Sequence, residues 1–222
     1  MSRLVACEKS QGKNLKIPVC HGHLEAVVRE PRGLIRGAAV VCHPHPLQGG
    51  TMHTKAVYRV AQAMAEIDIV ALRFNFRGVG RSTGTYDAGV GEREDTKSAL
   101  DWLEERYPKV TLMAGGFSFG SMVALRVGLT DPRVKALFGF GVPVRLYDYS
   151  FLADTAKPTL LVQGSQDEFG TALELQKAVA SFGPEVSVAT VEGADHYFSG
   201  AVDGLKKSVA KYFTKGPGGD IL

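Results

Sequence analysis

The chain has 222 residues, of which 45% are hydrophobic and 22% are charged, so it is long and apolar enough to bury one substantial core. Its formal charge of +3 is too small to indicate nucleic-acid binding, and no run is long enough to span a membrane. The three cysteines contain no C-x-x-C pair, and the N-terminus has no apolar signal core. We therefore expect a cytoplasmic protein with neither nucleic acid nor a membrane as a partner.

The first half of the chain predicts strands that alternate with helices. Apolar runs over 15–19 and 24–28 predict an N-terminal antiparallel hairpin, and Gly37–Cys42 and Ile69–Phe74 predict strands buried on both faces. A helix is expected from about Thr51, with one apolar stripe: Ala56, Val57, Val60, Ala61, Met64 and Ala65. After a glycine-rich loop to about Gly91, a second helix is expected to bury Ala99, Leu100 and Leu103 and to end near Tyr107.

The second half repeats the alternation. Strands are expected over 110–114, 134–140, 159–163 and 186–191. Helical spacing is found over 121–130, in the set Ala172, Leu175, Val179 and Phe182, and in the set Val202, Leu205, Val209 and Tyr212. Such alternation predicts one α/β domain, a mostly parallel, doubly wound sheet flanked by helices. Its core is expected over 13–214, and the glycine-rich residues 215–222 are expected to form a loose tail.

The turn between the strand over 110–114 and the following helix has the G-x-S-x-G pattern, as Gly116-Phe117-Ser118-Phe119-Gly120. Strand, turn and helix in this order are the context of a nucleophile elbow, which holds its serine in a tight turn at the edge of the sheet. A second match places Ser82 between Gly80 and Gly84, but no strand precedes it and no helical pattern follows it. Ser118 is therefore the candidate nucleophile.

A serine hydroxyl needs a neighbouring base, which a third group must orient. Asp167 follows the strand over 159–163, and His196 follows the strand over 186–191. Both therefore lie at carboxyl ends of strands, where sites of parallel sheets form. We expect Ser118 to be the nucleophile, His196 the general base and acid, and Asp167 the orienting carboxylate. Asp195 and Glu168 compete with Asp167 for the third role.

Five segments in order resemble the small bacterial α/β-hydrolases related to dienelactone hydrolase and esterases. They are HPHPLQGG at 43–50, FNFRGVGRS at 74–82, GFSFG at 116–120, GSQD at 164–167 and GADH at 193–196. The resemblance spans residues 15–213 and implies the α/β-hydrolase fold and a Ser-His-Asp hydrolase without cofactors. Dienelactone hydrolases carry cysteine as nucleophile where this chain has Ser118, so dienelactone is not the expected substrate.

The oxyanion hole is expected to use the backbone N–H of Phe119, the residue after the nucleophile, at the positive end of a helix. The second donor is expected in the loop after the strand Gly37–Cys42. Pro44 and Pro46 have no N–H, which leaves His45 and, as a fallback, Leu47. The connection over 141–157 is too short for a cap domain, so the site should be open. Substrate-binding walls or core packing are expected from five residues: Leu47, Phe117, Tyr147, Tyr149 and Phe198.

The sequence gives less support to metal binding and to dinucleotide binding. His43-x-His45 and His21-x-His23 could suggest metal ligands, but no further ligands at defined spacing accompany them. Gly78-x-Gly80 begins like a dinucleotide fingerprint, yet the position for the third glycine holds Thr83 and no helical pattern starts there. Arg77 and Arg81 are expected to be structural or exposed.

We therefore expect a serine hydrolase that cleaves short, accessible carboxylic esters through an acyl-enzyme. Thioesters, lactones and amides use the same machinery and remain open as substrates. A hydrolase-like scaffold with a binding role and little turnover is the alternative of another class. Activity should fall in acid, because a protonated imidazole at His196 cannot accept the serine proton.

Overall fold

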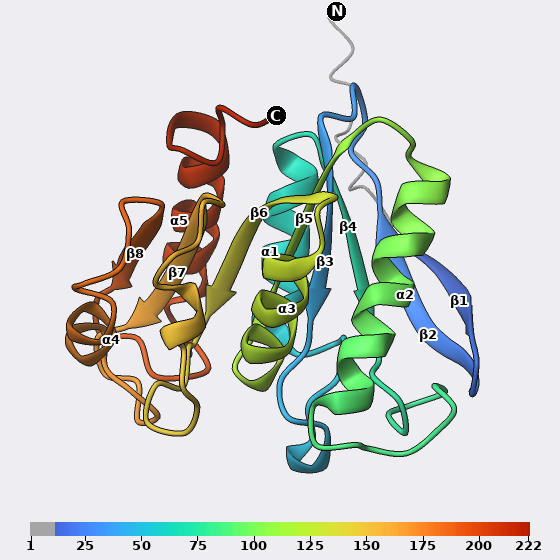
Figure 1. Ribbon diagram of the computed structural model, residues 1–222, viewed down its shortest axis with the longest axis horizontal. Helices are drawn as coiled ribbons and strands as arrows, with labels where there is room; N and C mark the ends of the chain where they lie inside the picture. Colours follow the sequence, from blue (N-terminus) through green and yellow to red (C-terminus); the bar gives the residue numbers. More distant parts are fainter. Residues whose placement is uncertain (1–11) are drawn as a thin grey trace, which may run out of the picture.

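The computed structural model describes residues 12–222 as an eight-stranded sheet in the order β1-β2-β4-β3-β5-β6-β7-β8, with helices on both faces (Figure 1). The predicted hairpin is present: β1 (Lys13–Val19) and β2 (Gly22–Arg29) pair antiparallel across a two-residue turn. β2 in turn pairs antiparallel with β4 (Ile69–Phe74). The hairpin therefore extends one edge of an otherwise parallel sheet.

The remaining strands run parallel, and the candidate site residues lie at their carboxyl ends. They are β3 (Gly37–Cys42), β5 (Thr111–Phe117), β6 (Val134–Phe140), β7 (Thr159–Gly164) and β8 (Val186–Val191). β3 lies between β4 and β5, and all six of its residues are buried. Its unbroken apolar run is what a strand covered on both faces requires, which confirms the prediction.

Five helices cover the two faces. α1 (Lys55–Glu66) and α5 (Val202–Lys215) pack together on one face, and α2 (Val90–Arg106), α3 (Phe119–Thr130) and α4 (Ala172–Ala178) pack on the other (Figure 1). Short 3₁₀ helices, η1 (Pro46–Gln48) and η2 (Ser150–Leu152), interrupt two loops. The connection between β6 and β7 contains η2 and no cap domain, so the fold is the lidless α/β-hydrolase fold. Among the helices described, none is long and apolar enough to cross a bilayer.

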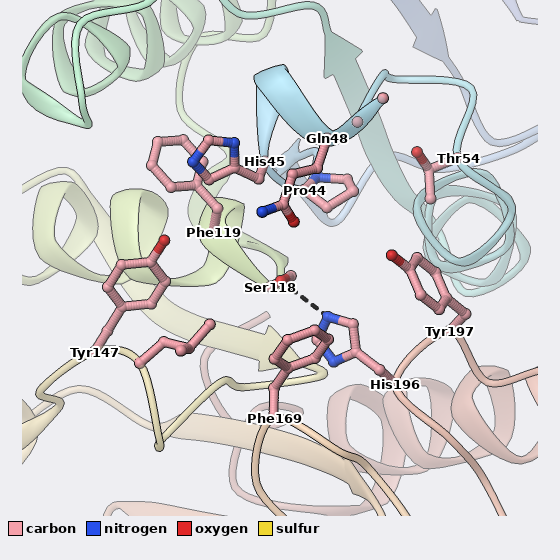
Figure 2. Close-up of a pocket in the computed structure, with 13 residues that line it drawn as sticks. Pro44, His45, Gln48, Thr54, Ser118, Phe119, Tyr147, Phe169, His196 and Tyr197 are labelled. Atoms are coloured by element: carbon pink, nitrogen blue, oxygen red, sulfur yellow. Dashed lines mark hydrogen bonds between the residues drawn. The ribbon is translucent and has the colours of Figure 1, made fainter.

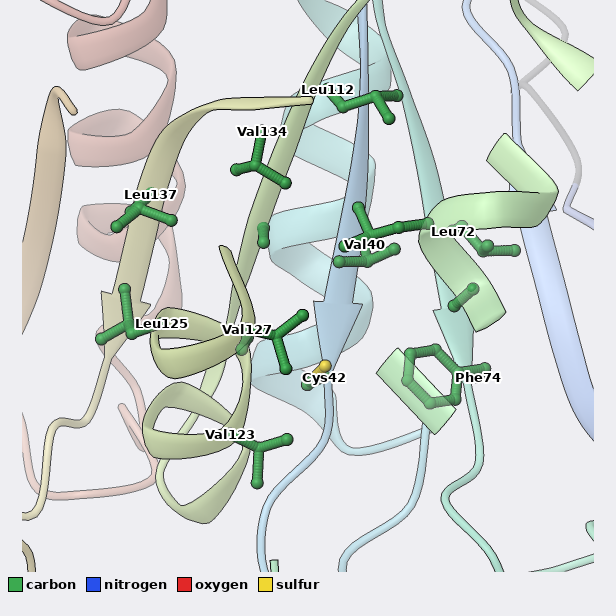
Figure 3. Packing of buried hydrophobic residues seen from close by; sticks show 14 of the residues in the cluster. Val40, Cys42, Leu72, Phe74, Leu112, Val123, Leu125, Val127, Val134 and Leu137 are labelled. Atoms are coloured by element: carbon green, nitrogen blue, oxygen red, sulfur yellow. The ribbon is translucent and has the colours of Figure 1, made fainter. Parts of the chain in front are cut away.

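The core has two layers, one on each side of the sheet. Alternate residues of β3 contribute to the two layers: Val40 and Cys42 face α2 and α3, while Val41 faces α1. Figure 3 shows the layer under α3, where Val123 and Val127 approach the strands. Burying one such aliphatic side chain contributes roughly 1.5–3 kcal/mol, so these two layers hold the strand ends in place.

Two helix boundaries differ from the prediction. α1 begins at Lys55 rather than near Thr51, because the Thr54 N–H donates to the Thr51 carbonyl in a turn before the helix. α4 ends at Ala178, so Phe182 does not continue the helical stripe. The Phe182 N–H donates to the Val179 carbonyl in a turn, and Gly183 and Pro184, a pair that disfavours helix, follow.

The residues after α5 fold back onto the protein. A loose tail is the expectation for 215–222, but the Gly219 N–H donates to the Gly216 carbonyl in a turn. The Thr111 hydroxyl donates to the Ile221 carbonyl at 2.9 Å, and Ile221 and Leu222 pack on the core layer under α5. Apolar side chains at the end of the chain account for this packing.

Candidate active site

Ser118 lies in the tight turn between β5 and α3, with φ 54° and ψ −122°. A non-glycine residue rarely adopts positive φ, so the turn must be held by its surroundings. A Cβ on Gly116 would lie 2.5 Å from the Gly120 carbonyl oxygen, and a Cβ on Gly120 would lie 2.4 Å from the His43 carbonyl oxygen. Both glycines are therefore required by the close approach of β3, β5 and α3.

The three predicted polar side chains meet in one hydrogen-bonded line (Figure 2 draws its first link). The Ser118 Oγ lies 2.9 Å from His196 Nε2, and His196 Nδ1 lies 2.8 Å from Asp167 Oδ2. Asp167 is fully buried and His196 is 3% exposed. An ionised Asp167 can only accept, so His196 carries its proton on Nδ1 and turns the Nε2 lone pair toward Ser118.

Asp167 is oriented by neighbours that the sequence prediction did not include. The buried Gln163, in β7, donates from Nε2 to Asp167 Oδ2 at 2.9 Å, and the Phe169 N–H donates to Oδ1 at 2.8 Å. Gln163 is itself held by Val142, whose N–H donates to its Oε1 at 2.6 Å. A polar residue near the end of an otherwise apolar buried strand is the signal that could have identified Gln163.

The two other candidates for the third role face elsewhere. Asp195 accepts the Ser199 N–H at 2.8 Å, and this hydrogen bond lowers the pKa of the Asp195 carboxyl. Glu168 accepts the backbone N–H of His196 at 3.2 Å rather than a hydrogen bond from the imidazole ring. Of the three carboxylates, only Asp167 is hydrogen-bonded to the ring of His196.

The two expected oxyanion donors lie beside Ser118. Phe119 is the first residue of α3, and within residues 12–222 neither its N–H nor that of His45 donates to a protein acceptor. The fallback donor is occupied, because the Leu47 N–H donates to His45 Nδ1 at 3.2 Å. His45 therefore carries its ring proton on Nε2, 3.1 Å from the Tyr86 hydroxyl, while burial lowers its pKa.

The histidine pairs considered as metal ligands have other partners. His21 lies 3.0 Å from the buried Asp95 carboxylate and 3.3 Å from the Thr83 hydroxyl. His43 is bonded to backbone through both ring nitrogens. In the described part of the chain, no three His, Cys, Asp or Glu side chains are grouped closely enough to hold a metal ion.

A hollow of about 90 Å³ opens above Ser118 (Figure 2). Its walls carry no Asp, Glu, Lys or Arg. They are Pro44, His45, Gln48, Gly49, Gly50, Thr54, Ser118, Phe119, Leu146, Tyr147, Phe169, His196 and Tyr197. Tyr147 and Phe119 lie on one side of Ser118 in Figure 2, and Tyr197 and Thr54 lie on the side of His196.

Of the five predicted wall residues, only Tyr147 lines this hollow. Phe117 is buried beneath His196, with ring centroids 5.0 Å apart, and Phe198 lies in the core under α5. Tyr149, at the start of η2, is buried with its hydroxyl 2.9 Å from that of Ser121, which is the core packing left open as the alternative. Leu47 is 72% exposed outside the hollow.

Several wall residues were not predicted, and they are Gln48, Thr54, Leu146, Phe169 and Tyr197. Most follow a strand's carboxyl end within a few residues, and Tyr197 is adjacent to His196. A position in the loop after a strand's carboxyl end therefore indicates a residue near the site, but it does not indicate whether that side chain points into the hollow.

The second G-x-S-x-G match has a structural role, as expected. The buried Ser82 hydroxyl donates to the Asn75 carbonyl at 2.6 Å and accepts the Glu25 N–H at 2.8 Å. Nearby, Arg77 forms an ion pair with Asp95, with Nη2 2.7 Å from Oδ1. These contacts attach the glycine-rich loop to β2 and α2.

Known proteins resemble this chain over most of its length. A family model described as an alpha/beta hydrolase domain matches residues 39–208. An uncharacterized protein of Rickettsia prowazekii is 34% identical over 183 residues, which are 78% of this chain and 77% of the relative.

Two solved structures show the same architecture. An alpha-beta serine hydrolase homologue from Coxiella burnetii has a TM-score of 0.84 at 36% identity, covering 90% of this chain and 96% of that one. A serine hydrolase without a lid from Xanthomonas campestris has a TM-score of 0.83 at 28% identity, covering 93% and 94%. With its elbow, strand order and matched length, this chain belongs to the α/β-hydrolase family.

Proposed function

We propose that the protein is a serine hydrolase that cleaves short, uncharged carboxylic esters through an acyl-enzyme. The observation that carries this proposal is the hydrogen-bonded line from Ser118 through His196 to Asp167, next to two unpaired backbone N–H groups. The relation to serine hydrolases from Coxiella burnetii and Xanthomonas campestris supports it.

In the acylation half-reaction, Ser118 Oγ attacks the ester carbonyl carbon as His196 Nε2 takes the hydroxyl proton. Asp167, bonded to Nδ1–H, stabilises the imidazolium that forms. The carbonyl oxygen becomes an oxyanion and accepts from the N–H groups of Phe119 and His45. Such donors are already oriented, and the Phe119 N–H lies at the N-terminus of α3, so they stabilise the transition state more than the substrate.

Collapse of the tetrahedral intermediate then breaks the bond to the alcohol. His196 Nε2 gives its proton to the leaving oxygen, and the acyl group stays on Ser118. In deacylation, His196 takes a proton from water, the water oxygen attacks the acyl carbon, and the proton returns to Ser118 as the acid leaves.

The walls of the hollow support this choice of substrate class. The leaving oxygen must reach His196, so the alcohol occupies the side of Tyr197 and Thr54, whose hydroxyls suit a neutral polar alcohol (Figure 2). The acyl group then lies against Tyr147 and Phe119. A hollow of about 90 Å³ has room for a short acyl group, and its walls carry no Asp, Glu, Lys or Arg that would favour a charged substrate.

Labelling with a fluorophosphonate probe tests the nucleophile. We expect the probe to modify Ser118, the label to disappear in Ser118→Ala, and the label to persist in Ser82→Ala, which retains the elbow. Mapping the modified peptide by mass spectrometry identifies the site. An intact, folded protein that takes no label would favour the alternative of a scaffold with a binding role.

A substrate panel tests the acyl and alcohol preferences. We expect kcat/KM to be highest for acetyl to butyryl esters of neutral alcohols and to fall for octanoyl esters and for esters of charged alcohols. Matched thioesters, lactones and amides belong in the panel because the same catalytic groups could cleave them. A higher kcat/KM for one of these classes would replace the ester assignment.

A further inference from the structure

His43 is a fully buried polar residue directly after β3, and the proposed mechanism does not use its side chain. Its Nδ1 lies 2.7 Å from the Pro44 carbonyl oxygen, and its Nε2 lies 3.0 Å from the Phe76 backbone nitrogen. The ring also packs against the Phe76 ring, with centroids 4.7 Å apart. Every polar atom of this side chain is therefore engaged with the backbone.

These two contacts determine where the ring proton sits. The Phe76 N–H can only donate, so Nε2 must be the unprotonated acceptor. The proton is then on Nδ1, which donates to the Pro44 carbonyl. Burial lowers the pKa of His43 to about 4, so near neutral pH the ring is uncharged and keeps this one tautomer.

The bond to the Pro44 carbonyl has a consequence for the next residue. The Pro44 carbonyl and the His45 N–H belong to one planar trans peptide, so they point in opposite directions. Because His43 holds the carbonyl toward the buried side, the His45 N–H is turned toward the hollow that contains Ser118.

The peptide on the other side of His45 is held as well. Its carbonyl accepts the N–H groups of Gln48 and Gly50, each at 3.1 Å. A Cβ on Gly50 would lie 2.2 Å from the Pro44 oxygen, so the loop folds tightly around this point. His43 is the side chain that connects this loop to the core, because its Nε2 is bonded to Phe76 in the loop after β4.

We infer that His43 is a positioning residue that fixes the Pro44–His45 peptide so that the His45 N–H faces the developing oxyanion. The inference rests on the proposed function, since it concerns the second oxyanion donor. It assigns different roles to the two histidines of the 43–50 segment: His45 contributes a backbone donor, and His43 orients that donor through its side chain.

Two substitutions remove the two bonds separately. In His43→Asn, the side-chain amide has the reach of Nδ1 and can still donate to the Pro44 carbonyl. In His43→Gln, the amide oxygen has the reach of Nε2 and can accept the Phe76 N–H, but the bond to Pro44 is lost. Val40→Ala, in β3 just before His43 and in the core layer that includes Phe76, is the matched control for a general loss of packing.

The readouts are kcat and KM per fluorophosphonate-titratable site, and the Ki of a trifluoromethyl ketone, whose hemiketal oxygen mimics the oxyanion. For His43→Gln we expect kcat to fall about 10- to 100-fold, less than the roughly 10²–10³ for a deleted oxyanion donor, with KM nearly unchanged and Ki raised in parallel. His43→Asn should retain more kcat than His43→Gln. Val40→Ala should lower thermal stability and leave both constants per active site unchanged.

The inference is overturned if His43→Gln matches Val40→Ala in kcat and Ki, or if its loss lies in KM alone. If His43→Gln does not fold, long-range ¹H–¹⁵N spectra of the wild-type protein decide: His43 should show a protonated Nδ1 and a bare Nε2, and the opposite tautomer overturns the assignment. Wild-type protein that fails to label at Ser118 would instead remove the proposed function itself.

Discussion

At the residue scale, the proton positions of the site follow from a few buried contacts. Asp167 Oδ2 accepts from both Gln163 and the His196 ring, and Oδ1 accepts from the Phe169 N–H, so the carboxylate is held in one orientation against the ring. A ring held in this tautomer is what general-base catalysis by Nε2 requires. The identity of the carboxylate is therefore open to a direct test.

We predict that Asp167→Asn lowers kcat about 10³- to 10⁴-fold with little loss of folding, because an amide can donate to Nδ1 and favours the wrong tautomer. Asp195→Asn and Glu168→Gln, which remove the charges of the two neighbouring carboxylates, should change kcat by only a few-fold. Steady-state kinetics on one ester measures all three. A large loss in Asp195→Asn with a small one in Asp167→Asn would reverse the assignment.

His43 also predicts a pH dependence of stability. Its pKa of about 4 in the folded protein is below the ordinary histidine value of about 6.5, so the unfolded chain takes up the proton first as pH falls. Stability from this group is therefore present above pH 6.5 and decreases toward pH 4, by at most about 3 kcal/mol at 1.36 kcal/mol per pH unit.

Urea unfolding of the wild-type protein and of His43→Asn between pH 6.5 and pH 4 measures the contribution of His43 to the pH dependence of stability. The free energy of unfolding should fall more steeply in the wild type, because asparagine does not titrate. Among charged groups, Asp95 acts on His43 in the opposite direction and reduces the difference. Parallel curves for the two proteins would contradict the prediction.

At the element scale, the site depends on how closely β3 approaches the start of α3. In Gly120→Ala, the new Cβ would lie 2.4 Å from the His43 oxygen and 2.7 Å from the Cys42 oxygen, both backbone atoms that cannot rotate away. We expect the free energy of unfolding to fall by about 1–3 kcal/mol. Activity should fall as well, because the two proposed oxyanion donors lie on the two segments that must separate.

Gly33→Ala is the control, because a Cβ at Gly33 meets nothing within 4 Å and its φ is not positive. Denaturant titration and kcat per labelled site should place Gly33→Ala near the wild type. If Gly120→Ala were as stable and as active as Gly33→Ala, the close approach would not limit the site.

At the scale of the whole molecule, the absence of a cap leaves Ser118 partly exposed at the rim of the sheet. We predict that the rate with a sparingly soluble short ester rises smoothly with concentration and saturates without a jump at the solubility limit. Among residues 12–222, no segment has to open before substrate reaches Ser118. A titrimetric assay across that limit measures this, and an abrupt increase above it would indicate a covering element.

Local patterns in the sequence predicted the strands, most of the helix stripes and the tight turn that holds Ser118. Period and local sterics carry these predictions: β3 could be predicted because a run of six small and apolar residues is typical of a strand covered on both faces. Ser118 could be predicted because Gly116 and Gly120 permit a close approach that a Cβ would block. The order of the strand ends was enough to select His196.

Only the tertiary structure decided the walls of the hollow and the partners of each polar group. Tyr149 was expected either in a wall of the site or in the core, and the turns around η2 place its side chain in the core. Gln163 and His43 act through contacts with loops whose paths no local pattern encodes. Their roles depend on packing between segments distant in the chain, and side-chain direction there is set by the whole fold.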